Sequence, residues 1–289
     1  TEINRLNKIY MRNLEASGVE ILNGRAVFKD AHTLLVDGRE ITANYILVAT
    51  GATPFMPHIA GIEHAISSNE AFHLEDFPSD ITIVGGGYIA VEFAGIFNGL
   101  GADVMLVYRG EEILRGFDGD IRTHVQEEMI KKGVDVQTEN DVTSIQKNDD
   151  GFEITLKDGT KRKTSCVMYA TGRIPYAQGL GLDVVGVELG AKGEIKVDAY
   201  SQTSVENIYA VGDVTDRSQL TPVAISEGAA FAETIFNNNP LVVDYSNIPT
   251  AVFSQPPVGT VGMTEAEARD EMLEIDIYKS VFRPMKHTL

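Results

Sequence analysis

The sequence has only one cysteine, Cys166, and little positive charge, with 24 lysine and arginine residues against 42 aspartate and glutamate residues. A single cysteine excludes an internal disulfide bond and is typical of proteins in a reducing, cytoplasmic compartment. A chain with a formal net charge of −18 is repelled by nucleic acids and by anionic membrane surfaces. Neither is therefore expected as a partner.

Long hydrophobic runs are also missing. The longest are strand-sized segments such as 45–49 and 104–107, whereas a membrane-spanning helix needs about 18 or more apolar residues. The polar opening segment, 1–5, does not resemble a secretory signal. Histidine and cysteine residues are not clustered at the spacing of metal ligands, so no metal site is predicted. None of the six histidines is assigned to catalysis.

Strand and helix patterns alternate along the chain, which favours an α/β fold. Apolar residues recur with the helical period across residues 3–14, which predicts a first helix. Short segments separated by turn residues then predict an antiparallel meander that leads into the apolar strand 45–49. The segments of this meander are 19–23, 25–28, 33–36 and 39–42. The stretch 277–282 also has a strand-like pattern.

The same pattern occurs a second time. A meander over residues 152–164 leads into the apolar strand 167–170, and both apolar strands end in Ala-Thr-Gly, at Gly51 and at Gly172. Such self-similarity predicts two dinucleotide-binding domains in tandem. The second domain has a glycine-rich turn at 85–87, and the equivalent turn of the first domain would fall ahead of residue 1. We therefore expect the chain to be an internal fragment of a longer protein.

The glycine-rich turn, Gly-Gly-Gly-Tyr-Ile-Ala at 85–90, follows a predicted strand and opens a predicted helix. This is the context of a Rossmann fingerprint, in which a pyrophosphate rests on the helix N-terminus. Gly85 would permit the tight turn, Gly87 would let the backbone approach the pyrophosphate, and Ala90 is small enough for close helix–strand packing. A lone match of this kind also fits an ordinary strand–helix turn.

Two arginines follow the next predicted strand, 103–108. An NAD site would place an acidic residue there, about 20 residues after the turn, to bind the ribose 2′-hydroxyl. This sequence instead has Arg109 and, shortly after it, Arg115. A pair of guanidinium groups suits a 2′-phosphate, because arginine binds phosphate bidentately and stays charged. NADPH is therefore favoured over NADH, the alternative being that both arginines are ordinary exposed loop residues.

Taken together, these motifs resemble the flavin-dependent pyridine nucleotide–disulfide oxidoreductases. The matching segments run in the order of that family along nearly the whole chain, at 49–51, 85–92, 109 with 115–118, 170–173, 207–213, 220–224 and 245–262. The resemblance implies tandem FAD/NAD(P)-binding Rossmann-like domains with antiparallel meanders, plus the start of an α+β interface domain. The implied division is 1–52 for the C-terminal part of the FAD-binding domain, 53–174 for the NADPH-binding domain, 175–246 for a central FAD-contacting domain and 247–289 for the start of a dimerisation domain.

The resemblance also implies roles for matching residues. Tyr88 would cover the flavin where nicotinamide docks, and Glu92 would support the site through a lysine that lies outside this chain, so that here it would lack its partner. Asp213 would bind the ribityl chain of FAD. The implied NADPH-side residues are Gly85, Gly87, Tyr88, Ile89, Ala90, Glu92, Arg109, Arg115, Gly172 and Arg173, and the implied FAD-side residues are Thr50, Gly51, Asp213, Leu220 and Thr221.

The implied reaction is the reduction of glutathione disulfide by NADPH, through FAD and a redox-active cysteine pair, in a homodimer. That cysteine pair is absent from this chain, because Cys166 is expected to be a small core residue. The chain should therefore bind NADPH without turning over a disulfide. Three alternatives stay open: a reductase for trypanothione or another low-molecular-weight disulfide, a non-catalytic NADPH-binding module, and a cysteine-independent flavin reductase.

Overall fold

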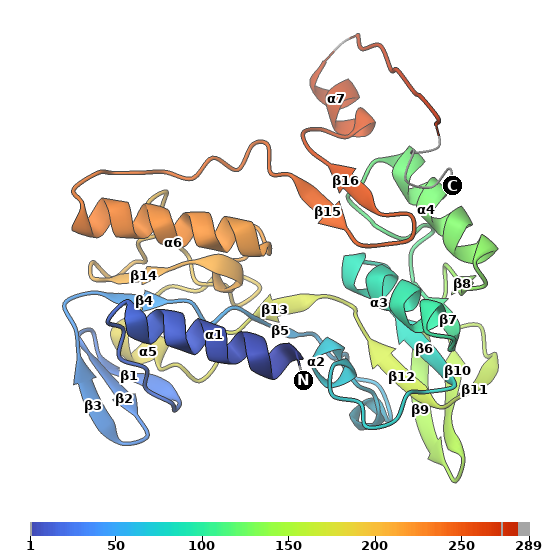
Figure 1. The fold of residues 1–289 in the computed structure, drawn as a ribbon, viewed down its shortest axis with the longest axis horizontal. Helices are drawn as coiled ribbons and strands as arrows, with labels where there is room; N and C mark the ends of the chain where they lie inside the picture. The colour runs from blue at the N-terminus through green and yellow to red at the C-terminus, as the bar shows by residue number, and fades with distance from the viewer. Residues whose placement is uncertain (1, 273, 283–289) are drawn as a thin grey trace. The chain divides into compact units, whose positions relative to one another are not determined.

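The computed structural model describes residues 2–272 and 274–282, which divide into two compact units (Figure 1). Unit 1 comprises residues 1–53 and 174–243, and unit 2 comprises residues 54–173 and 244–289. The chain passes between the units within β5 (Ala52–Pro54), within β13 (Arg173–Pro175) and after residue 243.

Unit 2 is built on a parallel four-stranded sheet in the order β12–β6–β7–β8. The strands are β6 (Asp80–Val84), β7 (Asp103–Val107), β8 (Asp135–Gln137) and β12 (Cys166–Tyr169). Helix α3 (Tyr88–Gly99) joins β6 to β7, and α4 (Gly119–Lys131) joins β7 to β8. Parallel neighbours need such crossover helices, so the predicted alternation of strand and helix is confirmed in this unit.

This sheet is covered on both faces, which explains why its strands read as continuous apolar runs. Successive side chains of a strand point to opposite faces. Ile83 and Leu106 pack in a core with α3 and α4, whereas Val107 and Tyr169 pack in a second core against an antiparallel sheet. That second sheet, in the order β11–β10–β9, consists of β9 (Val142–Asn148), β10 (Gly151–Leu156) and β11 (Lys161–Thr164).

The rest of unit 2 consists of short elements. They are η1 (Ile62–His64), α2 (Ser68–Ala71), β15 (Thr250–Val252), β16 (Val258–Thr260) and α7 (Glu265–Glu271). The strand predicted at 277–282 is wrong: this stretch has no regular structure, and the side chains of Tyr278 and Val281 are almost fully exposed. A strand-like pattern forms no strand without a neighbour to pair with. His287 lies outside the described residues.

Unit 1 combines several helices with an antiparallel meander and a parallel strand pair (Figure 1). Its elements are α1 (Glu2–Ala16), β1 (Ala26–Asp30), β2 (Thr33–Val36), β3 (Arg39–Thr42), β4 (Ile46–Val48), α5 (Leu182–Val185), β14 (Ile208–Ala210), η2 (Gly212–Thr215) and α6 (Thr221–Phe236). Strands β4 and β14 are parallel neighbours. The core joins segments that are far apart in the sequence, such as Phe28, Ile46 and Ile208.

The first meander has three strands rather than the four segments predicted. Residues 19–23 form no strand, and the side chains of Val19 and Leu22 are exposed. The sheet order β1–β2–β3 uses the later three segments only. The exposed apolar side chains of this segment bury too little surface to fix a strand register.

One buried carboxylate stabilises the carboxyl end of β14. Glu227, on α6, is only 1% exposed. Its Oε2 accepts a hydrogen bond of 2.5 Å from the backbone N–H of Gly212, and its Oε1 lies 3.6 Å from Nε of Arg217. Gly212 has a φ of +75°, a conformation that favours glycine. The carboxylate therefore ties the turn after β14 to helix α6.

Removing this carboxylate should destabilise unit 1. We expect Glu227→Ala to lower the free energy of unfolding by about 3–5 kcal/mol. The Arg217 guanidinium, which is largely buried, and the Gly212 N–H then lose this carboxylate. Glu227→Gln keeps an acceptor for Gly212 and should cost less. Urea unfolding, combined with hydrogen exchange at the Gly212 amide, measures both effects.

The matched control is Glu20→Ala, which removes an exposed ion pair with Arg39 in the same unit. Exposed pairs contribute about 0–1 kcal/mol. Equal losses in the control and in Glu227→Ala would contradict the stabilising role of the buried carboxylate.

Candidate functional site

The glycine-rich turn after β6 is shaped by two close approaches. Gly85 has a φ of +139°, and a Cβ atom there would lie 2.3 Å from the carbonyl oxygen of Ala170. A Cβ on Gly86 would lie 2.4 Å from the ring of Tyr108. Gly87 meets nothing within 4 Å and is exposed. Packing thus requires the first two glycines, while the third leaves open space in front of α3.

Helix α3 begins directly behind this open space. Gly87 is its N-cap and supplies no capping side chain, and its first turn contains no acidic residue. Ile89 and Ala90, in that first turn, are held against the sheet, Ala90 being fully buried. Because the N-terminus of a helix carries partial positive charge, this end of α3 favours an anion.

A cavity of about 180 Å³ lies at this point of unit 2. It is lined by residues 86–89 of the turn and helix, by residues 170–172 after β12, and by Tyr108 and Arg115. The structure therefore brings together Gly87, Tyr88, Arg115 and Gly172, which the sequence predicted on the same side. The sequence analysis did not name Gly86, Tyr108 or Thr171 as site residues. Gly86 could have been found from the run of glycines, whereas Tyr108 and Thr171 reach the cavity only through the fold.

Arg109 and Arg115 are both exposed, and neither forms an ion pair with any acidic residue that the structure describes. Other arginines of the chain are engaged; Arg122, for example, donates to the carbonyl oxygens of Glu112 and Ile113. Arg109 lines a second, neighbouring cavity of about 120 Å³, which shares Tyr108 and Thr171 with the first. The two guanidinium groups thus offer cationic contacts near the open end of α3.

Glu92 lies on α3. The lysine that the resemblance implies as its partner lies outside this chain, and that role stays a prediction. Within the chain, Oε1 of Glu92 accepts a hydrogen bond of 2.8 Å from the backbone N–H of Phe253, which follows β15. Arg173 lies in β13, at the point where the chain leaves unit 2.

The remaining predicted residues lie in unit 1, at the carboxyl ends of β4 and β14. The N–H of Val211 donates to the carbonyl of Val48, so the two strand ends lie side by side. Thr50 and Gly51 follow β4, and Asp213 lies in η2 after β14. Helix α6 has Leu220 as its N-cap, Thr221 as its first residue and no capping side chain. Open α/β sheets bind ligands at such carboxyl ends.

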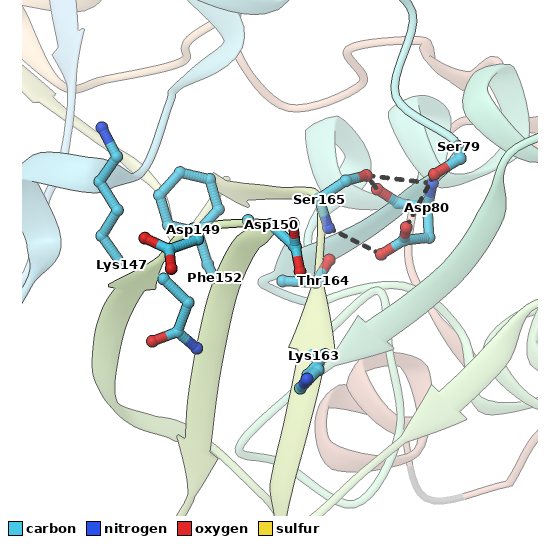
Figure 2. A pocket seen from close by; sticks show the side chains of 11 residues that line it. Ser79, Asp80, Lys147, Asp149, Asp150, Phe152, Lys163, Thr164 and Ser165 are labelled. Carbon is cyan, nitrogen blue, oxygen red and sulfur yellow. Dashed lines mark hydrogen bonds between the residues drawn. The ribbon is translucent and has the colours of Figure 1, made fainter.

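Another hollow of unit 2, about 630 Å³, lies at the amino ends of β6 and β12 and is lined by residues such as Asp80, Lys163 and Ser165 (Figure 2). Its polar groups bind one another: Ser165 donates its N–H to Oδ1 of Asp80 over 2.8 Å. Burial alone would raise the pKa of the Asp80 carboxyl, but hydrogen bonds from Ser165 and Ser79 outweigh burial and lower the pKa. The lysines point away from this carboxylate in Figure 2. These groups do not converge on a ligand.

Among residues 2–272 and 274–282, no group of three or more histidine, cysteine, aspartate or glutamate residues could hold a metal ion. No helix in that part of the chain has the length and apolar character needed to cross a membrane.

Two models of one family match most of this chain. A family model described as pyridine nucleotide-disulphide oxidoreductase matches residues 1–228, and the dimerisation domain of the same family matches residues 248–289. Glutathione reductase of Burkholderia cepacia is 48% identical over 288 residues, covering 100% of this chain and 64% of that protein. The chloroplastic/mitochondrial glutathione reductase of Pisum sativum is 49% identical, covering 100% of this chain and 52% of that protein. Trypanothione reductase of Leishmania donovani is 44% identical, covering 99% and 61%.

Among solved structures, the HOCl-induced flavoprotein disulfide reductase RclA from Escherichia coli aligns with a TM-score of 0.88 at 29% identity. The alignment covers 93% of this chain and 63% of RclA. The chain thus spans less than two thirds of the length of these relatives. The tandem Rossmann-like fold class and the resemblance drawn from the motifs are confirmed. The chain belongs to the pyridine nucleotide-disulphide oxidoreductase family.

Proposed function

We propose that unit 2 binds NADPH. One observation carries the proposal: the uncapped N-terminus of α3 opens into the cavity behind the glycine turn, beside two arginines without carboxylate partners among the described residues. The first feature suits a pyrophosphate and the second suits a 2′-phosphate. Tyr88 and Gly172, on the walls of the same cavity, would then contact the nucleotide.

The residues present fit this cofactor. A Cβ atom on Gly87 would have no neighbour within 4 Å, so a phosphate can approach the backbone closely. Arg115 lines the same cavity, and Arg109 lines the adjoining one. Bound there, NADPH supplies a hydride. The protein's part is to hold the pyrophosphate on α3 and to anchor the 2′-phosphate on the arginines.

FAD is the second cofactor that we assign. Thr50, Gly51, Asp213 and the N-terminus of α6 lie at the carboxyl ends of the parallel strands of unit 1, where Asp213 offers an acceptor for hydroxyl groups. The relatives named above as flavoprotein and glutathione reductases support this assignment. Glu92 and Tyr88 would act on the NADPH side of the flavin.

For the longer protein we propose the NADPH-dependent reduction of glutathione disulfide in a reducing, cytoplasmic compartment. The glutathione reductases among the relatives support this substrate, and trypanothione is the alternative because trypanothione reductases are nearly as similar. The domain division would be 1–52, 53–174, 175–246 and 247–289, the last segment contributing to a homodimer interface. A non-catalytic nucleotide-binding module or a cysteine-independent flavin reductase would share the same units.

The chain by itself should not turn over a disulfide. Cys166 is 8% exposed, and burial, together with the charge of Asp80, raises the pKa of its thiol to about 11. The thiolate is the attacking species in disulfide exchange, so a thiol held protonated in a core is inert. The cysteine pair that the proposed reaction needs would come from outside these 289 residues.

The arginine pair provides the direct test of nucleotide choice. Replacing both arginines (Arg109→Ala with Arg115→Ala) should weaken NADPH binding, at about 1.5–3 kcal/mol for each charged hydrogen bond lost. NADH lacks the 2′-phosphate and should bind almost unchanged. Calorimetric titration of the chain with each nucleotide measures both affinities.

A matched control is the double variant Arg162→Ala with Lys163→Ala. It changes the charge of unit 2 by the same amount, but it alters β11 and the far edge of the sheet. NADPH affinity should stay near that of the unaltered chain. If the Arg109/Arg115 variant loses NADPH and NADH affinity equally, the proposal that these residues bind the 2′-phosphate is wrong.

Two glycines of the turn, Gly85 and Gly87, should respond differently to alanine. Gly87→Ala has room for its Cβ and an extended backbone, so the chain should fold normally. The added methyl group obstructs the pyrophosphate, and both NADPH and NADH should bind about tenfold more weakly, equivalent to ~1.4 kcal/mol. Gly85→Ala, by contrast, collides with the Ala170 carbonyl and should lower the melting temperature. A thermal melt and a titration of each variant separate the two effects, and unchanged affinity of Gly87→Ala for both nucleotides would show that phosphate does not approach there.

A further inference from the structure

Tyr169 has a buried hydroxyl that the packing of its ring does not explain. It is the last residue of β12, and the whole residue is 1% exposed. The phenol oxygen forms no hydrogen bond with any described residue. Burying a hydroxyl without a partner costs free energy, and a phenylalanine would fill the same space without that cost.

Tyr169 lines the smaller cavity beside the glycine turn, which we call the annex. The annex is lined by Val84, Tyr108, Arg109, Asp141, Tyr169 and Thr171, together with residues of the connecting segment 55–57 and neighbours on the strands. Its volume of about 120 Å³ is large enough for about four water molecules at their liquid volume of ~30 Å³ each. Its wall is largely apolar but includes the side chains of Arg109 and Asp141, and such polar partners are what a buried water needs.

Asp141 supplies a second polar group to the annex. Its Oδ1 accepts a hydrogen bond of 2.9 Å from the N–H of Val142, whereas Oδ2 has no partner among the described residues. Burial, and to a smaller extent the charge of Asp141, raise the pKa of the Tyr169 phenol, so the two groups are close enough to interact. They form no direct hydrogen bond. A water molecule between them would satisfy both.

The annex also adjoins the nucleotide cavity. The two cavities share Tyr108 and Thr171, and Arg109 lies in the annex wall. Arg109 forms no ion pair with described residues, so no carboxylate of that part of the chain fixes its guanidinium group. A hydrated carboxylate nearby can orient this group through water without neutralising it as a direct ion pair would.

We propose that the annex is a hydration subsite in which Tyr169 and Asp141 hold ordered water that orients Arg109 toward the nucleotide. Tyr169 is then a positioning residue for phosphate recognition, acting through water and Arg109. The inference rests on the NADPH binding proposed above. It adds to that proposal a residue from the opposite core of the sheet, because Tyr169 packs with the β9–β10 sheet rather than with α3.

The test is Tyr169→Phe, which removes one oxygen atom and keeps the ring. Titration of the chain with NADPH and NADH should show NADPH affinity reduced about three- to tenfold, as for one lost hydrogen bond, with NADH affinity unchanged. A thermal melt should show an equal or higher melting temperature. A purely structural hydroxyl would not change the ratio of the two affinities.

Tyr209→Phe is the matched control, because Tyr209 is also buried on a strand but lies in unit 1, where its hydroxyl accepts from Gln202. It should leave both nucleotide affinities unchanged. An unchanged NADPH-to-NADH ratio in Tyr169→Phe, or equal losses for both nucleotides, would overturn the hydration subsite. If the unaltered chain does not prefer NADPH, the proposed function itself fails.

A crystal structure provides a readout that is independent of affinity. At high resolution, the unaltered chain should show water bonded to the Tyr169 hydroxyl and to Asp141. The same structure of Tyr169→Phe should show that water displaced or weakened. If the electron density of the unaltered chain shows no water at the Tyr169 hydroxyl, the proposal is overturned. This outcome counts even if Tyr169→Phe is too unstable to titrate.

Discussion

The close approach of Gly85 to the carbonyl of Ala170 is the constraint on which the nucleotide side depends. With 2.3 Å between a Cβ and that oxygen, only glycine fits, and the turn after β6 lies directly on the end of β12. The approach brings residues 170–172 into the wall of the cavity behind α3. Gly86, which lies under the Tyr108 ring, adds the end of β7. Three strand ends thus meet around one helix N-terminus, where fixed dipoles favour a phosphate.

The strong local patterns of this site could be predicted from sequence. A strand, three glycines, a small residue and a helix predicted the β6–α3 turn. Arg109, which stands soon after β7 where an NAD site would have an acidic residue, predicted the preference for NADPH. Contacts between distant segments could not be predicted in this way. The hydrogen bond from the Phe253 N–H to Glu92, for example, joins residues that are far apart in the chain. Residues 19–23 show the opposite failure: the segment was predicted as a strand, but it pairs with no strand of the β1–β2–β3 sheet.

Net charge and local charge act at different distances in this molecule. The formal charge of −18 repels large polyanions, which sense the whole surface. A small dinucleotide senses mainly the groups within about 8 Å at physiological ionic strength. Near α3 those groups are a helix N-terminus without a first-turn acid, and Arg115. Many acids elsewhere are engaged locally, as Glu112 is with Arg122. An acidic protein can therefore offer a selective cationic pocket without becoming a general binder of polyanions.

The two units share one structural motif at a strand end, but different contacts stabilise it in each unit. Each has a strand that ends in Ala-Thr-Gly, and the glycine has a positive φ, +70° at Gly51 and +125° at Gly172. In unit 1 the buried carboxylate of Glu227 bonds the adjoining turn to α6, so protein groups satisfy one another. In unit 2 the close packing at Gly85 and Gly86 holds the turn, and the buried Tyr169 hydroxyl has no hydrogen-bond partner among the described residues. Polar groups without protein partners at a strand edge favour a polar ligand or water. In unit 2, the Tyr169 hydroxyl is such a group.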